Sequence, residues 1–204
     1  MWRQAEKFLL KDKYIAPLIK KWGSCTIKKS PKSKYFVNLL EAITNQQLSG
    51  KAASTIFGRV KDLCKGGISP EAILKLSEPK LRKAGLSHAK TKYVKDLAIQ
   101  TQNDSITSCA NLKLQVLDKL SDEEVKRELV AVKGIGPWTA DMFLMFSLGR
   151  PDIFPAEDLG IKNGFEKVTG KKFDKIKSAK FAEEHWKPWR TVASWFLWRS
   201  LENR

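Results

Sequence analysis

The stretch 121–148 restricts the fold more than any other, because it specifies two helices and the turn between them. Its first four residues, Ser-Asp-Glu-Glu, form a capping-box pattern, in which serine and the second glutamate satisfy free N–H groups at a helix start. That helix is predicted to end near Val130. A Gly134-Ile135-Gly136 turn follows, and Pro137 fits the first turn of a second helix reaching about Leu148. The two glycines permit the positive φ angles and the close backbone approach that a hairpin between helices demands.

This unit matches the helix-hairpin-helix pattern, in which a Gly-Ile-Gly turn offers backbone N–H groups to a phosphate. The start of the second helix adds a partial positive charge, so the hairpin suits a DNA backbone. Such contacts position DNA without reading its sequence. The residues assigned to this contact are Lys133, Gly134, Gly136 and Thr139. The alternative is an ordinary tight corner between two helices.

Helical spacing recurs along the rest of the chain, which is therefore predicted to be all-α. Apolar residues recur at this spacing within 36–43 and again within 53–60. The polar segment between them reads as a corner, with Ser49 as the N-cap of the second helix. Ser69 and Pro70 begin a further helix.

Charge indicates a polyanionic partner. The 204 residues include 38 Lys and Arg against 22 Asp and Glu, a formal charge of +16. Residues 1–35 carry ten basic and two acidic residues, 36–161 carry 17 and 15, and 162–204 carry 11 and five. Such an excess attracts nucleic acid or an acidic membrane surface. The alternative is a lysine-rich surface that serves solubility. With neither a membrane-length apolar run nor a signal peptide, we expect an intracellular protein.

The rare residues exclude several metal and redox classes. Cys25, Cys64 and Cys109 are far apart in sequence, which argues against a zinc ribbon, an iron–sulfur cluster and a disulfide framework. We expect three reduced, mostly buried thiols. With His88 and His185 as the two histidines, catalysis is expected to use a carboxylate rather than a transition metal.

Asp158 is the carboxylate best placed for such a role. It follows a Phe-Pro-Ala-Glu segment and precedes a predicted helix that runs to about Val168. An aspartate at a helix start is held in its charged form by hydrogen bonds and by the helix dipole. On local sequence alone, an ordinary N-cap is the alternative.

Together these segments resemble the HhH-GPD superfamily of DNA glycosylases, and in particular the 3-methyladenine DNA glycosylase II family. The resemblance spans about residues 35–199, and it is carried by ITNQQLSGKAAS (43–54), VKGIGPWTADMF (132–143), DIFPAEDLGIKNGF (152–165) and WKPWR (186–190). It implies a two-lobed, all-α fold with Asp158 in the cleft between the lobes. The lobes are predicted at 36–149, containing the hairpin 132–140, and at 1–35 plus 150–204, which is basic. The N-terminal β-rich domain of some members is expected to be lacking.

The resemblance assigns catalysis to Asp158, whereas Glu157 matches a variable position. It implies that an alkylated base of the 3-methyladenine or 7-methylguanine type is flipped from duplex DNA and excised. The carboxylate would stabilise the cationic sugar that develops as the base departs. Family members that also cut the strand carry a nucleophilic lysine where this chain has Trp138, and an indole cannot form a Schiff base. The resemblance thus implies a monofunctional enzyme that leaves an abasic site.

A pocket for the flipped base is implied at Trp138, Trp198 and Met142. Helical geometry also places Trp198 about 180° from Trp189, away from the apolar face of the last helix. Electron-rich indoles attract cationic bases. For each tryptophan the alternative is core packing, which we assign to Trp186 and Trp189.

The segment that enters DNA in this family corresponds to Gln46, Gln47, Leu48 and Ser49, with Gln47 at the intercalating position. Some relatives carry an apolar residue there. The alternative is a helix corner capped by polar side chains.

The resemblance also implies a structural Na⁺ or K⁺ at the hairpin, bound by the carbonyls of Val130, Val132 and Ile135. No other cofactor and no iron–sulfur cluster is expected. The expected partner is damaged duplex DNA, with no membrane partner, and the chain is expected to be a monomer in the cytoplasm or nucleoid of a prokaryote, or in a eukaryotic nucleus. Two alternatives remain open: a glycosylase of different lesion range, and a non-catalytic helix-hairpin-helix DNA-binding protein.

Overall fold

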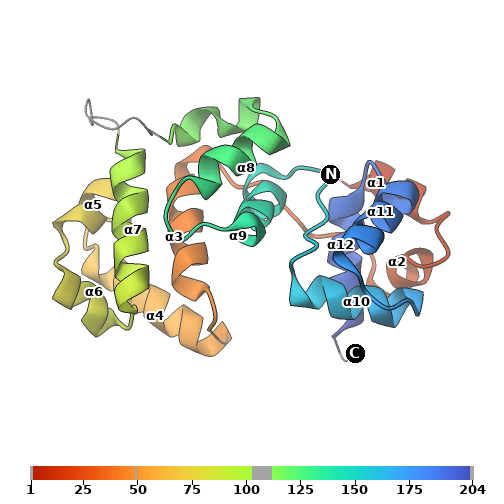
Figure 1. Ribbon diagram of the computed structural model, residues 1–204, viewed down its shortest axis with the longest axis horizontal. Helices are drawn as coiled ribbons and strands as arrows, with labels where there is room; N and C mark the ends of the chain where they lie inside the picture. Colours follow the sequence, from red (N-terminus) through yellow and green to blue (C-terminus); the bar gives the residue numbers. More distant parts are fainter. Residues whose placement is uncertain (1, 49, 103–111, 203–204) are drawn as a thin grey trace. The chain divides into compact units, whose positions relative to one another are not determined.

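The computed structural model describes residues 2–48, 50–102 and 112–202, and all the regular elements in these ranges are helices (Figure 1). The predicted all-α class is confirmed. No helix in the described ranges is long and apolar enough to cross a membrane. The chain divides into two compact units, which are treated separately below: unit 1 comprises 1–29 and 144–204, and unit 2 comprises 30–143.

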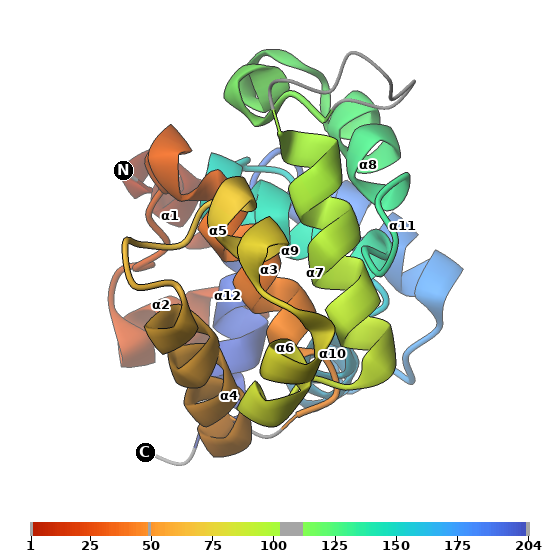
Figure 2. The ribbon, with the colours of Figure 1, turned by 90° about the vertical axis from the view of Figure 1, so that its left-hand side faces the viewer.

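Unit 2 is built around a buried helix, α3 (Tyr35–Asn45), whose inward face carries Leu39, Leu40 and Ile43. Figure 2 shows α5 (Pro70–Lys75), α6 (Glu78–Ala84) and α7 (His88–Thr101) in front of it. The remaining helices of the unit are η1 (Lys32–Lys34), α4 (Gly50–Leu63), η2 (Leu114–Lys119), α8 (Asp122–Val130) and α9 (Pro137–Met142). The predicted helices at 36–43, 53–60 and after Ser69 are therefore present.

Unit 1 packs around α12 (Arg190–Ser200), which is buried on several faces because α1, α2, α10 and α11 all contact it. Its core includes the fully buried Trp186, Phe165 and Phe196. At Gly164 an added Cβ would lie 2.5 Å from the Leu197 carbonyl, so glycine lets α10 approach α12 closely. The four surrounding helices are α1 (Arg3–Leu9), α2 (Ala16–Trp22), α10 (Leu159–Thr169) and α11 (Lys175–Trp186).

The predicted lobes are 36–149 and 1–35 plus 150–204. Both boundaries between the observed units lie a few residues earlier in the sequence. Residues 30–35 join unit 2, because Lys32 bonds to the Gln115 carbonyl and to Asp118. Residues 144–149 join unit 1. The second hairpin helix continues to Leu148, as predicted. From Phe143 onward, however, it is a π-helix with wider hydrogen bonding (η3, Phe143–Leu148).

Candidate active site and nucleic-acid interface

The hairpin between α8 and α9 has most of its predicted local structure. Ser121 accepts a hydrogen bond from the Glu124 N–H and Glu124 reaches back, so the capping box is confirmed. Gly134 has the predicted positive φ, at 85°. Gly136 does not use this freedom: its φ is −96° and its ψ is 176°, an extended backbone. The reason is Pro137, whose ring disfavours helical conformations in the residue before it.

The hairpin turn is held from behind by side chains of α7. A Cβ at Gly134 would lie 2.3 Å from the Tyr93 ring, so this glycine is required both by its φ and by the ring beneath it. Asp96 accepts a 3.0 Å hydrogen bond from the backbone N–H of Lys133, whose side chain is exposed. A Cβ at Gly136, in contrast, would meet nothing within 4 Å. The turn is therefore packed on its inner side at Gly134 and open at Gly136.

The predicted DNA-entering corner lies beside the hairpin within unit 2. Gln46 donates from Nε2 to the Gly134 carbonyl (2.8 Å) and to Thr139 Oγ1 (3.3 Å), which connects the corner to the hairpin. Gln47 is exposed and has a φ of 56°, in the left-handed region that non-glycine residues seldom adopt. Leu48 is exposed as well. Ser49, with its predicted N-cap role, lies outside the described residues.

One predicted contact residue lies in the wrong place for a side-chain contact with DNA. Thr139 is only 2% exposed, and its hydroxyl accepts from Gln46. It stands on the inner face of α9, which packs against α3. Its side chain therefore supports the corner rather than facing a ligand.

Asp158 in unit 1 lies at the start of α10, as predicted, and is the N-cap of this helix. Its Oδ1 accepts from the backbone N–H of Ile161 (2.8 Å) and from the indole N–H of Trp198 (2.8 Å). A Cβ at Gly160 would lie 2.7 Å from the Trp198 ring and 2.9 Å from Asp158 Oδ1. The glycine thus lets the indole reach the half-buried carboxylate, and two N–H donors hold one oxygen of a negative group at a helix start.

The approach to Asp158 is anchored to α12. Arg190 forms a bidentate pair with Asp152 at 2.7 and 2.9 Å. Next to it, the Thr191 hydroxyl accepts from the Ile153 N–H and donates to the Arg150 carbonyl. Bidentate and buried hydrogen bonds of this kind fix geometry. The segment that leads to the carboxylate is thereby held to the helix that carries Trp198.

Trp186 is fully buried in the core of unit 1, and the half-buried Trp189 and Trp198 both pack against that core. Trp198 differs from the other two in its hydrogen bond to Asp158. The core assignments of Trp186 and Trp189 are therefore confirmed. Phe146, which the sequence did not single out, is 39% exposed and stacks on Trp198 with ring centroids 5.9 Å apart. Phe146 lies in an apolar run of the sequence, and its stacking contact with Trp198 is what distinguishes it.

The other implied pocket residues belong to unit 2. Trp138 and Met142 are both half-buried and lie four residues apart on α9, so they share one face of that helix. A pocket formed by these residues with Trp198 stays a prediction.

The carbonyls proposed for a monovalent cation lie at the end of α8 and in the turn. The carbonyl of Val132 accepts from the Ile135 N–H at 3.1 Å, which closes the turn. A carbonyl oxygen has a second lone pair, so this bond is compatible with ligation by Val130, Val132 and Ile135. The cation stays a prediction.

Two of the three thiols fit the predicted buried, unpaired state. Cys25 and Cys64 are free and buried, and burial raises the pKa of both thiols, that of Cys25 to about 12. Cys109 lies outside the described residues.

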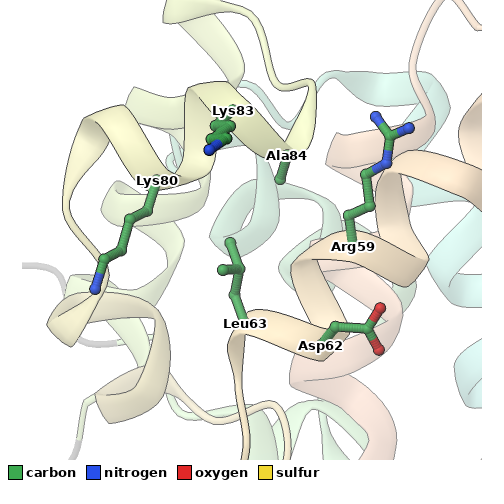
Figure 3. A pocket seen from close by; sticks show the side chains of 6 residues that line it. All are labelled: Arg59, Asp62, Leu63, Lys80, Lys83 and Ala84. Atoms are coloured by element: carbon green, nitrogen blue, oxygen red, sulfur yellow. The ribbon is translucent and has the colours of Figure 1, made fainter.

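A separate surface pocket of about 280 Å³ lies between α4 and α6 (Figure 3). Its lining combines apolar atoms with basic side chains and contains none of the predicted site residues; it is formed by Arg59, Asp62, Leu63, Lys80, Lys83 and Ala84.

Glu157, beside the catalytic candidate, is paired with Lys175 at the start of α11.

Known proteins are similar to this chain over most of its length. DNA-3-methyladenine glycosylase 1 of Schizosaccharomyces pombe is 34% identical, over 83% of this chain and 73% of that protein. The alkylbase DNA glycosidase-like protein mag2 of the same yeast is 31% identical, over 97% of this chain and 93% of its own length. The solved structure of S. pombe 3-methyladenine DNA glycosylase (Mag1) in complex with abasic DNA is similar, with a TM-score of 0.81 and 33% identity over 97% of this chain and 96% of that one.

A family model described as HhH-GPD superfamily base excision DNA repair protein matches residues 40–191, a range that includes the corner, the hairpin and Asp158. The chain therefore belongs to the HhH-GPD superfamily of base excision DNA repair proteins.

Proposed function

We propose that this protein is a DNA glycosylase that hydrolyses the N-glycosidic bond of alkylated bases, of the 3-methyladenine and 7-methylguanine type, in duplex DNA. The observation that carries the proposal is Asp158, a carboxylate held at a helix start by the Ile161 and Trp198 N–H groups. Relatives named as 3-methyladenine glycosylases, and one solved bound to abasic DNA, support the substrate class.

The chemistry needs one well-placed negative charge. As the base departs, positive charge develops on the sugar, and a fixed carboxylate stabilises that transition state because it is oriented before the reaction begins. An alkylated purine already carries positive charge, so it leaves as a neutral base without a strong general acid. Asp158 supplies the charge, and the indole of Trp198 sets the orientation of its Oδ1. Water adds to the sugar carbon that the base leaves and loses a proton, which gives the abasic sugar.

The reaction stops at the abasic site. Strand cleavage by this superfamily's lyases requires an amine nucleophile, and the corresponding position is Trp138. Lys133 is the nearest lysine in the hairpin, and its backbone N–H is bonded to Asp96. Its exposed side chain suits a phosphate contact.

DNA is held through unit 2 in this proposal. The open Gly136 side of the turn admits a phosphate, Gln47 fills the gap left by the flipped base, and Trp138 and Met142 face that base. A monovalent cation on the hairpin carbonyls would strengthen the phosphate contact by its charge.

The test uses a duplex with a single 7-methylguanine, incubated with excess protein, and measures released base and strand breaks separately. We expect release of 7-methylguanine, and strand breaks only after alkali treatment. Strand breaks without alkali would contradict the monofunctional assignment. No base release from this duplex or from one bearing 3-methyladenine would favour the non-catalytic alternative, and release of unmethylated lesions alone would favour a different lesion range.

A further inference from the structure

One side of α7 contacts both the corner and the hairpin. Lys90, Tyr93 and Asp96 stand three residues apart, so they lie along a single side of this helix. Tyr93 underlies Gly134 and Asp96 bonds to the Lys133 N–H, as described above. Lys90 donates from Nζ to the carbonyls of Thr44 (2.8 Å) and Gln46 (2.7 Å). Figure 2 shows α7 in front of α3.

The corner that Lys90 contacts is a type II turn. The Leu48 N–H donates to the Asn45 carbonyl (3.2 Å), Gln46 has φ −50° and ψ 134°, and Gln47 has φ 56°. Type II turns need a positive φ at their third residue, which is usually glycine. A glutamine in this conformation costs about 1 kcal/mol or more, so other contacts must hold the turn.

The orientation of the Gln46 carbonyl distinguishes the two common turn types. Type I and type II turns differ by a flip of the central peptide, here the one that joins Gln46 to Gln47. Lys90 holds the oxygen of this peptide and also a carbonyl at the negatively polarised end of α3. Flipping the peptide would break the Gln46 bond, and Gln47 would return to a negative φ with its side chain redirected.

We propose that Lys90 is a positioning residue, whose bonds to the Thr44 and Gln46 carbonyls keep the corner in the type II form and so direct Gln47 into the DNA stack. The inference rests on the proposed insertion of Gln47. It does not depend on the chemistry of Asp158, which belongs to unit 1.

The same helix provides a matched control. Lys95 also lies on α7 and also donates to carbonyls at a helix end, those of Ile73, Leu74 and Leu76 at the end of α5. Burial lowers the pKa of both lysines. Replacing either by methionine therefore removes a half-buried ammonium and leaves carbonyls without their donor, but only Lys90 contacts the corner.

The experiment measures base unstacking without base excision. The probe is a duplex with a tetrahydrofuran abasic analogue and 2-aminopurine opposite it, and the readout is the fluorescence gain at saturating protein. We expect a gain with the wild type, an amplitude lower by about threefold or more in Lys90→Met, and near wild-type amplitude in Lys95→Met and Lys90→Arg, since unstacking frees the fluorophore. Thermal unfolding monitored by circular dichroism confirms that each variant is folded, and Lys90→Gln replaces Lys90→Met if the latter is not.

Three results would overturn the proposal: a wild-type amplitude in folded Lys90→Met, an equal loss in Lys90→Met and Lys95→Met, or no fluorescence gain with the wild type. None of them depends on base release, which is measured separately on the 7-methylguanine duplex. Failure of the positioning role is thereby distinguishable from failure of the proposed glycosylase activity.

Discussion

In unit 1 the proposed chemistry rests on one side chain, the carboxylate of Asp158, which a backbone N–H and an indole N–H hold in place. In unit 2 the proposed DNA contact rests on backbone groups of the hairpin and on the Gln47 side chain at the corner, and the side chains of Lys90, Tyr93 and Gln46 hold these two segments. The two regions should therefore respond differently to substitution. A change at Asp158 removes the charge that stabilises the transition state, whereas a change in unit 2 alters how DNA is bound.

The largest expected effect is that of Asp158→Asn. The amide keeps the shape of the side chain and still offers an oxygen to the Ile161 and Trp198 donors, but it lacks the negative charge. We expect the single-turnover rate of 7-methylguanine release to fall by about a hundredfold or more, since a fixed charge of this kind is a large part of catalysis. A rate within about threefold of wild type would remove Asp158 from the proposed role.

Trp198→Phe tests the support of that carboxylate. Phenylalanine retains an aromatic ring for the contact with Phe146 but lacks the N–H that bonds to Asp158. A hydrogen bond to a charged group contributes about 1.5–3 kcal/mol, so a loss of about tenfold in single-turnover rate is expected. Phe146→Leu is the comparison, because it removes the stacked ring and leaves the hydrogen bond. An equal loss in both variants would mean that Trp198 acts as a wall and not through its N–H.

In unit 2, alanine substitutions at the two hairpin glycines are expected to have different effects, one on DNA affinity and the other on stability. Gly136→Ala adds a methyl group in open space, so the free protein should keep its stability, while a phosphate at the turn would be pushed away. We expect a Kd for duplex DNA about fivefold weaker, the equivalent of roughly one hydrogen bond. Gly134→Ala instead meets the Tyr93 ring and a φ of 85°, and should lower the free energy of unfolding by about 1–3 kcal/mol. Unchanged DNA affinity in Gly136→Ala would exclude the phosphate contact at that position.

The smallest effect concerns the basic chain ends, 1–35 and 162–204, which hold most of the excess positive charge and are expected to supply salt-dependent attraction for DNA. Lys28, Lys172 and Lys177 are exposed residues of unit 1, and Lys61, Lys65 and Lys75 are exposed residues of unit 2. Replacing the first three by glutamine should flatten the slope of log K against log salt, by up to about 0.9 for each phosphate that the protein no longer neutralises. The same change in the second three should leave the slope unaltered. Equal slopes in both triple variants would contradict a DNA attraction concentrated in the chain ends.

Short-range features were predictable from sequence because their causes lie within a few residues. The capping box at Ser121, the positive φ of Gly134 and the N-cap role of Asp158 each follow from neighbours in the chain. The extended backbone of Gly136 also has a local cause, since the following proline disfavours helical conformations in the residue before it.

Tertiary supports were not predictable in the same way. Tyr93 is an ordinary aromatic residue of an amphipathic helix until the fold brings it under Gly134, and Lys90 resembles any surface lysine. The need for glycine at position 160 has no local sign in the sequence either, because it comes from the Trp198 ring, which lies much later in the chain. Such contacts depend on which helices pack together, and periodicity does not specify that.

The division of roles between the two regions is tested most directly by measuring two quantities on two variants. Asp158→Asn and Gly136→Ala are each assayed for the Kd of a tetrahydrofuran-containing duplex and for the single-turnover rate of 7-methylguanine release at saturating protein. We predict that Asp158→Asn loses rate and keeps its Kd, while Gly136→Ala loses affinity and, once saturated, keeps its rate. If Asp158→Asn retained its rate, or if Gly136→Ala lost rate at saturation as strongly as affinity, that division would be contradicted.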